Sequence, residues 1–420
     1  MLDVSEKKTE INQLYHPTGN FEQDSQDIIY SKDNINKSKF AHIAIKEWFY
    51  LVKENGYIII DYQPNKIVDF KKLEKLFWWL WKQKYEIIYH GTLSPDDLKN
   101  ITGNKLNKYI QNLQKYYQTD LDPRTLLPKP RPTQTHPDTQ NGYLRFIAKK
   151  TKSTLIPGDN INKWTFGIIT NGQRMDWMEE ILESIHAQKI PEYEIIVCGT
   201  YHDQKKDNFT YIPFNQRDDL GWITRKKNLI IQKAKYENLC IIHDRAIFPK
   251  NWFTEMKKYG NCFEIMCNRQ FYQGMRAYDW TTLGGPDGTQ YKMLLLDYRD
   301  WDWWSVIGGM QIISKKSILQ KVPLDETRHW NGFEDSELTF NLRDAGYIAR
   351  INQAEIKTLG FRHGLIPGKP FNKKFYWPDM LTRRIIRTIA YYTTNIPYLH
   401  KQLESFTKTE VYKKIIKLKA

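Results

Sequence analysis

The sequence predicts an α/β fold in which a mostly parallel sheet is flanked by helices. The apolar strand-like segment Trp164–Thr170 is followed by a helix-spaced segment over 175–187 and by a second strand-like segment, Tyr193–Gly199. Each strand-like segment ends in residues typical of turns. Strands that alternate with helices form parallel sheets, and ligands bind beside the carboxyl ends of such strands. We therefore expect Thr170, Asn171, Gly199 and Thr200 to lie together at a binding edge.

Length and composition are those of a globular protein. The chain has 420 residues, of which 40% are hydrophobic and 14% aromatic, enough for two or three domains with their own cores. It has no apolar run of roughly eighteen residues, and its first residues lack the pattern of a signal peptide, so we expect a cytoplasmic protein. The four cysteines lack the spacing of a zinc site and are expected to be buried thiols.

The net charge is strongly positive and uneven. It is +15 overall, and residues 364–420 contain 12 Lys and Arg against three acidic residues. A basic surface attracts nucleic acid, an anionic membrane or a phosphorylated substrate. A lysine-rich composition also follows from an AT-rich genome, which accounts equally well for the charge outside this tail. No nucleic-acid-reading motif is present, so no nucleic-acid partner is expected.

Changes in composition divide the chain into four regions. Residues 1–37 form a polar arm that is expected to be disordered or loosely docked. A partial α/β region over 38–155 follows, and the main α/β domain spans 162–365. The last region, 366–420, contains two basic amphipathic helical segments. These segments are expected either to pack on the main domain or to contact an anionic membrane peripherally.

The region 38–155 alternates between helices and strands. The expected elements are a helix over 41–52, a turn over 53–56, strands over 57–62, 85–90 and 143–149, and helices over 70–84 and 95–117. This order resembles the C-terminal half of a class I S-adenosylmethionine-dependent methyltransferase. The Gly-rich cofactor loop of that family would lie before residue 40, where no such glycines occur, so no S-adenosylmethionine is expected to bind. The region is interpreted as a remnant or a docking domain, with methyl transfer kept as an alternative activity.

Two adjacent carboxylates, Glu334 and Asp335, stand between a glycine turn and the predicted start of a helix that Gly346 would end. A helix N-terminus holds a carboxylate ionised and fixed in direction, as a general base requires. An ordinary N-cap with a solvated neighbour is the alternative.

Several segments of the main domain resemble, in order, the inverting glycosyltransferases of the GT-A fold, close to family 2. The strands over 164–170 and 193–199 match the strands that bind the nucleotide-sugar, so the four residues at their ends are implied donor contacts. The segment 219–228, DLGWITRKKN, matches the segment beside the donor diphosphate. The resemblance implies that Arg225 and Asn228 bind the donor, and a cationic helix start suits a pyrophosphate. A solvated basic helix start is the alternative.

The segment 239–253, LCIIHDRAIFPKNWF, matches the strand that carries the family's metal-binding Asp-x-Asp motif. His243 and Arg245 occupy the positions of the outer aspartates, so only Asp244 remains as a hard oxygen ligand. The resemblance implies donor contacts from all three residues and a divalent metal, Mn²⁺ or Mg²⁺, held by Asp244 and by His363. Arg245 can also supply positive charge that a metal would otherwise bring.

The last matching segments concern the acceptor. Gly308 and Gly309 match a Gly-Gly segment beside the acceptor and donor sugar. The pair Glu334-Asp335 matches the family's Glu-Asp pair, which implies that Asp335 deprotonates an acceptor hydroxyl and that Glu334 orients the sugar or acceptor.

An aromatic and acidic insert precedes the Gly-Gly segment. Sugar faces stack on such rings, and we expect Trp303 or Trp304 to lie near the acceptor, although about half of the rings in the insert are expected in the core.

The sequence thus predicts a hexosyltransferase-type enzyme of polysaccharide biosynthesis. It would transfer a sugar from a nucleotide-sugar, by default a UDP-sugar, to a glycan or lipid-linked acceptor with inversion. An inactive GT-A-like protein that binds sugar or nucleotide is the non-enzymatic alternative.

Overall fold

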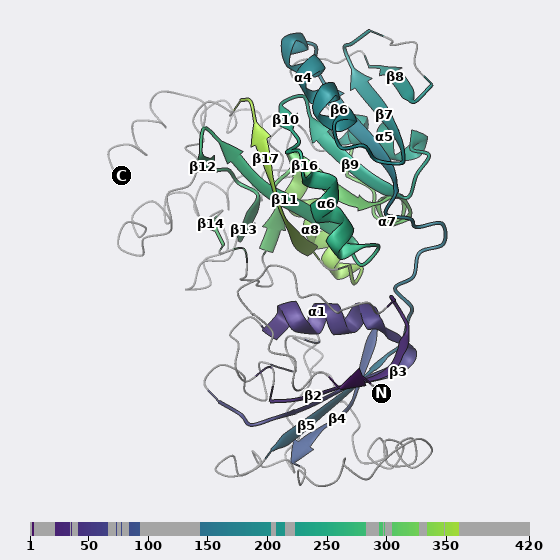
Figure 1. Cartoon of the computed structure of the whole chain (residues 1–420), viewed down its shortest axis with the longest axis vertical. Helices are drawn as coiled ribbons and strands as arrows, with labels where there is room; N and C mark the ends of the chain where they lie inside the picture. The colour runs from purple at the N-terminus through teal and green to yellow at the C-terminus, as the bar shows by residue number, and fades with distance from the viewer. Residues whose placement is uncertain are drawn as a thin grey trace, which may run out of the picture.

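The computed structural model describes two units of the chain, which Figure 1 shows one above the other. The described residues are 2–3, 22–33, 35, 41–65, 73, 77, 84–92, 143–202, 207–214, 223–282, 294–296, 298, 305–326, 334–347 and 349–360. Four predicted features, the helix over 95–117, the Trp303 and Trp304 pair, His363 and the basic tail, lie outside this set. No helix among the described residues is long and apolar enough to cross a membrane.

The N-terminal unit is a five-stranded sheet covered on one side by a helix. Its strand order is β1-β2-β3-β5-β4, with β1, β2 and β3 parallel and β5 antiparallel to both of its neighbours. The bounds are β1 Leu2–Asp3, β2 Gln26–Lys32, α1 Ala41–Leu51, β3 Val52–Tyr62, β4 Tyr85–Thr92 and β5 Leu144–Lys150. Helix α1 buries Ile45, Trp48 and Phe49 in the core of this unit.

Two predictions for this unit are wrong. The polar arm 1–37 is not disordered throughout, because β2 pairs with β3 and buries Ile29 completely. Segment 53–56 is not a separate turn. It lies within β3, where Asn55 adopts a positive φ of 65° beside an irregularity in the β2–β3 register. A left-handed Asn residue is typical of turns, but here sheet pairing continues through it.

The main domain is built on a nine-stranded sheet. Its order is β10-β17-β11-β16-β9-β6-β7-β8, with β12 paired to β11. Strands β8, β7, β6, β9, β11 and β17 share one direction, while β16, β10 and β12 run against it. The predicted fold class, a mostly parallel sheet flanked by helices, is therefore confirmed.

Strands β6 and β7 match the predicted strands within one residue, and β9 lies at the start of the segment that resembles the metal-binding strand. The bounds of the strands in the large sheet are β6 Lys163–Thr170, β7 Glu192–Gly199, β8 Phe209–Pro213, β9 Asn238–His243, β10 Ala246–Ile247, β11 Ile265–Tyr272, β12 Met275–Arg276, β16 Gln311–Lys315 and β17 Ala349–Thr358. A separate small sheet has the order β14-β13-β15, from β13 Trp280–Thr282, β14 Leu294–Leu295 and β15 Ser305–Ile307.

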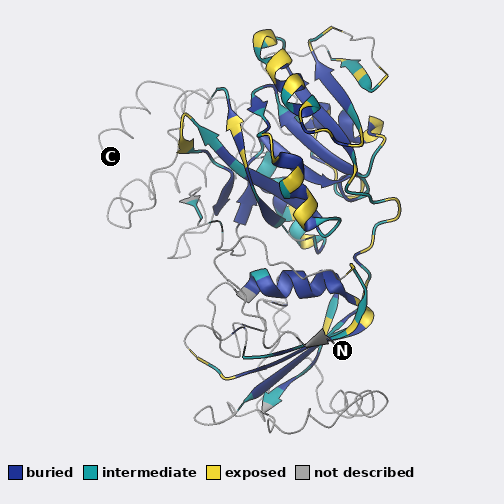
Figure 2. Ribbon diagram, in the orientation of Figure 1, coloured by how far each residue is buried: buried dark blue, intermediate teal, exposed yellow. Residues whose placement is uncertain are grey.

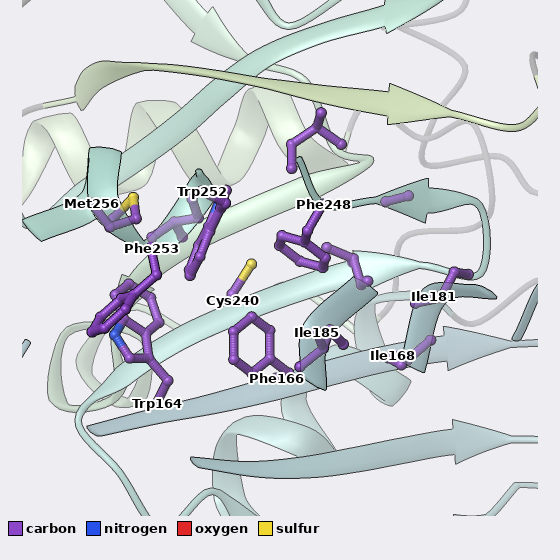
Figure 3. Packing of buried hydrophobic residues seen from close by; sticks show 14 of the residues in the cluster. Trp164, Phe166, Ile168, Ile181, Ile185, Cys240, Phe248, Trp252, Phe253 and Met256 are labelled. Atoms are coloured by element: carbon purple, nitrogen blue, oxygen red, sulfur yellow. The ribbon is translucent and has the colours of Figure 1, made fainter. Parts of the chain in front are cut away.

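Helices cover both faces of the large sheet. One face packs on α4 Met175–His186 and α6 Trp252–Tyr259, through a core that includes Trp164, Phe166 and Trp252 (Figure 3). The other face packs on α5 Ile223–Lys233, α7 Lys316–Lys321 and α8 Glu334–Asp344. The strands between these layers are almost wholly buried, whereas α4 exposes its outer side (Figure 2). Because helices cover both faces of the sheet, a functional site is expected at the ends of the strands.

Buried charges join the two units. Lys84 of the N-terminal unit pairs with Glu264 beside β11, and Glu47 of α1 pairs with Arg350 of β17. Lys46 Nζ donates a hydrogen bond of 3.0 Å to the carbonyl oxygen of Ala349. The side chains that make these contacts are all buried: Lys46, Glu47, Lys84, Glu264 and Arg350. Such pairs contribute to specific docking, because removal of one partner leaves a buried charge uncompensated.

Candidate functional site

Three parallel strands end side by side at the carboxyl edge of the main sheet. Thr170 of β6 is in register with Gly199 of β7, and Ile169 of β6 is in register with His243 of β9. Gly199 has a φ of +140°, and a Cβ there would collide with the carbonyl oxygen of Thr170. The close approach of these two strand ends therefore requires a glycine.

Asp244 is held from two sides directly after β9. Thr170 Oγ1 donates to its Oδ2 at 2.7 Å, and Arg174 Nη1 donates to its Oδ1 at 2.8 Å. The Asp244 side chain is 5% exposed, whereas the Arg174 side chain is 37% exposed. Arg174 was missed in the sequence because it precedes α4 as an ordinary polar residue. Only the fold brings it to a residue seventy positions away.

Two neighbouring lysines of α5 point toward the same edge and are buried. Lys226 Nζ donates to the carbonyl oxygen of Thr170 at 2.7 Å, and Lys227 Nζ donates to that of Gly309 at 3.0 Å. Arg225, the predicted donor contact, is about half exposed and lies 3.9 Å from Glu326. The sequence predicts a cationic helix start here, and in the structure α5 buries Lys226 and Lys227 while Arg225 stays half exposed.

Asn228 does not join the other predicted donor contacts. Its Nδ2 donates to the carbonyl oxygen of Leu324 at 2.8 Å and to Glu326 at 3.0 Å, while its Oδ1 accepts from the Leu324 N–H at 3.1 Å. The amide therefore ties α5 to the segment after α7. These contacts give Asn228 a structural role, and its predicted contact with the donor stays a prediction.

Two further predicted contacts, Asn171 and Thr200, lie in the turns that follow β6 and β7. Asn171 Oδ1 accepts a hydrogen bond of 3.2 Å from the N–H of Gln173, and Gly172, at a φ of +82°, packs against Thr200. The turn is closed by a 3.0 Å bond from the Gly172 N–H to Thr170 Oγ1. Both predicted residues thus line the edge near Asp244, where their roles stay predictions.

The turn between β15 and β16 connects this edge to the carboxylate pair. The N–H of His243 donates to the carbonyl oxygen of Met310 at 3.0 Å. On the other side, the N–H of Gly309 donates to Asp335 Oδ2 at 2.9 Å. Gly308 is held by the carbonyl oxygen of Asp279 at 2.9 Å. Both predicted glycines thus lie between the donor edge and the predicted base.

Asp279 is a buried hydrogen-bond acceptor that holds together part of the aromatic and acidic insert. It is fully buried and accepts hydrogen bonds from the backbone N–H groups of Gln270 and Trp280, from Arg276 and from the hydroxyl of Tyr298. The Arg276 guanidinium lies 3.6 Å from the centre of the Tyr298 ring. These residues of the insert are structural, and they position the carbonyl that holds Gly308.

Asp335 lies in the first turn of α8, as predicted. Its Oδ1 accepts from the Ser336 N–H at 2.7 Å and from the Ser336 hydroxyl at 3.4 Å, and its Oδ2 accepts from Gly309. The carboxylate is therefore fixed in direction while Oδ2 keeps a lone pair. Glu334 occupies the same first turn. The helix ends in a Schellman motif, with Gly346 N–H bonded to Arg343 and Tyr347 N–H bonded to Leu342.

The pKa values of Lys227 and His243 are shifted by burial and by the charged residues around the donor edge and the predicted base. Burial lowers the pKa of Lys227, and Glu334 and Asp335 oppose this lowering. Burial also depresses the pKa of His243 well below its ordinary value, and Lys227, Arg245, Arg174 and Lys226 depress it further. His243 is therefore neutral at physiological pH, and its buried Nε2 has no hydrogen-bond partner in the described part of the chain.

The described residues do not fit a divalent metal at Asp244. Both carboxylate oxygens already accept hydrogen bonds, one of them from a guanidinium. A hard cation needs several oxygen ligands, and among the described residues no three His, Cys, Asp or Glu side chains are grouped as ligands. His363, the other predicted ligand, lies outside the described residues.

Comparison with known proteins gives only distant similarity. No family model matches the chain, and no curated protein matches it. Among solved structures, S. aureus TarS aligns at 13% identity and a TM-score of 0.32, over 56% of this chain and 40% of that one. S. aureus TarS 1–349 in complex with UDP-GlcNAc aligns at 13% identity and 0.33, over 54% and 65%. The same protein in complex with UDP aligns at 13% and 0.31, over 54% and 64%. The chain thus spans less than two thirds of each of these structures.

Proposed function

We propose that this protein is a glycosyltransferase that uses a nucleotide-sugar, by default a UDP-sugar, and inverts the anomeric carbon. One observation carries the proposal. The Asp335 carboxylate is fixed at the start of α8 by the Gly309 N–H, and the same turn contacts the cationic strand edge through His243. A base for the acceptor and a site for an anionic donor therefore lie on either side of one short turn.

The proposed chemistry needs only one proton acceptor. Asp335 accepts the proton of an acceptor hydroxyl as that oxygen forms its bond to the anomeric carbon. The bond from the anomeric carbon to the phosphate oxygen breaks at the same time, and its electron pair leaves with the nucleoside diphosphate. Attack from the face opposite the leaving group inverts the configuration, so no covalent enzyme intermediate is required.

Glu334 and the acceptor side complete the proposal. Glu334, next to the base in the first turn of α8, would orient a hydroxyl of the sugar or acceptor through its carboxylate. The acceptor is proposed to be a glycan or a lipid-linked glycan. Trp303 or Trp304 would contribute a stacking surface for it, and the basic tail would contribute contact with an anionic membrane.

Calorimetry tests the donor class. UDP, other nucleoside diphosphates and S-adenosylmethionine are titrated separately into the full chain. Binding of a nucleoside diphosphate supports the proposal. Binding of S-adenosylmethionine with no response to any nucleotide contradicts it and favours the methyltransferase alternative.

Turnover of Asp335→Asn tests the base. With the nucleotide-sugar that binds best, release of nucleoside diphosphate should fall roughly 10²- to 10⁴-fold while nucleotide affinity is kept. Asp344→Asn, at the exposed end of the same helix, is the matched control and should keep its turnover. Nucleotide binding without turnover in the unmodified protein would instead indicate the inactive binding protein.

A further inference from the structure

The donor edge contains more positive than negative charge among the described residues. Arg174, Lys226 and Arg245 lie around His243 and depress its pKa. Asp244 is the carboxylate held within this group, through Arg174 and Thr170. A divalent cation at Asp244 would add two positive charges to an edge where cations already outnumber carboxylates. A diphosphate would instead neutralise that excess.

Arg174 has the geometry of an anchored but accessible anion receptor. Its Nη1 is held by Asp244 at 2.8 Å, and its guanidinium lies 5.4 Å from the centre of the Trp177 ring. The side chain is still 37% exposed. Its other N–H donors make no hydrogen bond within the described part of the chain. A guanidinium held in this way presents its remaining donors in a fixed fork, which matches phosphate oxygens.

The surrounding contacts favour the same ligand. Arg174 immediately precedes α4, so the N-terminus of this helix adjoins it. Lys226 is buried against the Thr170 carbonyl, so its positive charge cannot move away from the edge. The buried Nε2 of His243 is a polar atom without a partner among the described residues. All three features adjoin Asp244 or its partners: the start of α4 follows Arg174, Lys226 contacts Thr170, and His243 directly precedes Asp244.

We propose that the donor diphosphate binds this edge without a divalent metal, and that Arg174, oriented by Asp244, takes the place that a metal has in related folds. This inference rests on the proposed function and specifies its donor site. As the bond to the anomeric carbon breaks, negative charge develops on the terminal phosphate oxygen of the leaving group. Arg174 stabilises that charge by hydrogen bonding, and no proton is transferred to it. Asp244 is a positioning residue rather than a metal ligand.

The test is calorimetric titration of the full chain with inorganic pyrophosphate and with UDP, each in EDTA and in Mn²⁺. The two affinities for each probe should agree within about twofold. In EDTA, Arg174→Gln should weaken binding roughly 10- to 100-fold, as expected for loss of a charge-assisted contact. Arg174→Lys should recover part of this loss. Arg269→Gln, which removes an arginine paired with Glu355 elsewhere on the sheet, should bind as the unmodified protein does.

Asp244→Asn distinguishes a role of the Asp244 carboxylate in positioning Arg174 from a role as a metal ligand. If Asp244 positions Arg174, the variant should still bind UDP in EDTA, with a loss smaller than that of Arg174→Gln. Thermal unfolding of both variants verifies that they are folded. Binding that requires Mn²⁺, or undiminished binding by Arg174→Gln in EDTA, would overturn the inference and leave the glycosyltransferase proposal standing. Absence of binding by every nucleoside diphosphate in both conditions would overturn the proposed function and the inference together.

Discussion

The backbone N–H of Gly309 donates a 2.9 Å hydrogen bond to Oδ2 of Asp335. The carbonyl oxygen of the same glycine accepts a hydrogen bond from buried Lys227. A single peptide segment therefore fixes the predicted base on one side and a cation on the other. Because backbone groups make both contacts, their geometry depends on how closely this segment approaches α8.

Gly309→Ala should slow turnover about tenfold or more and leave nucleotide affinity nearly unchanged. A Cβ at this position would lie 3.0 Å from Asp335 Cβ and 3.1 Å from Oδ2, so the carboxylate must shift. Gly309 is not among the described residues with positive φ, so alanine itself is tolerated by the backbone. Steady-state kinetics and calorimetry on one preparation check the prediction. An unchanged kcat would contradict it.

Lys227→Met should lower turnover about tenfold while raising stability at neutral pH by about 1 kcal/mol. Burial lowers the pKa of Lys227 below its ordinary value, so the folded state binds its proton less tightly than the unfolded state does. The free energy of unfolding therefore decreases as pH falls from the unfolded-state pKa of Lys227 toward its folded-state pKa. Methionine has no proton to bind, so the variant does not lose this free energy. Chemical unfolding measures the gain. A variant that loses both stability and turnover would assign Lys227 a structural role.

Lys46→Met should flatten the dependence of stability on pH between about 7 and 10. Burial, and then Arg350, lower the pKa of Lys46 from 10.5 to about 7. The unfolded chain binds this proton more tightly, so the contribution of Lys46 to stability rises with pH across that window and is lost as pH falls through it. At pH 7 the variant should be more stable by about 1–3 kcal/mol. The difference between the two unfolding curves should vanish near pH 10, and a constant difference would refute the assignment.

The Lys84–Glu264 pair should dominate the stability of the contact between the two units. Glu264→Gln should destabilise the protein by about 3–5 kcal/mol, because Lys84 then remains buried without its partner. The double variant Lys84→Met/Glu264→Met should recover most of this loss. Lys53→Met, which removes an exposed pair with Asp27, is the matched control and should change stability by less than about 1 kcal/mol. Additive effects in the double variant would contradict the coupling.

The elements that sequence reasoning located well are those with strong local signals. The strand over 164–170 and the helix over 175–187 agree with β6 and α4 within one residue at each end. The end of α8 at Gly346 was also predicted, because a left-handed C′ position is encoded by the glycine itself. In contrast, β2 lies in the otherwise polar arm, and it is held by pairing with β1 and β3 and by burial of Ile29. A strand of that kind leaves little local signal.

By itself, the sequence determined the α/β class, the strand–helix–strand unit over 164–199 and the placement of Asp335 at a helix start. These depend on hydrophobic periodicity and on glycine positions, which act over a few residues. Only the tertiary structure decided which charges meet. It placed Arg174 on Asp244, turned Lys226 and Lys227 inward, and directed Asn228 to Leu324. The physical reason is that side-chain partners distant in sequence are chosen by strand register and helix rotation, which no local pattern specifies.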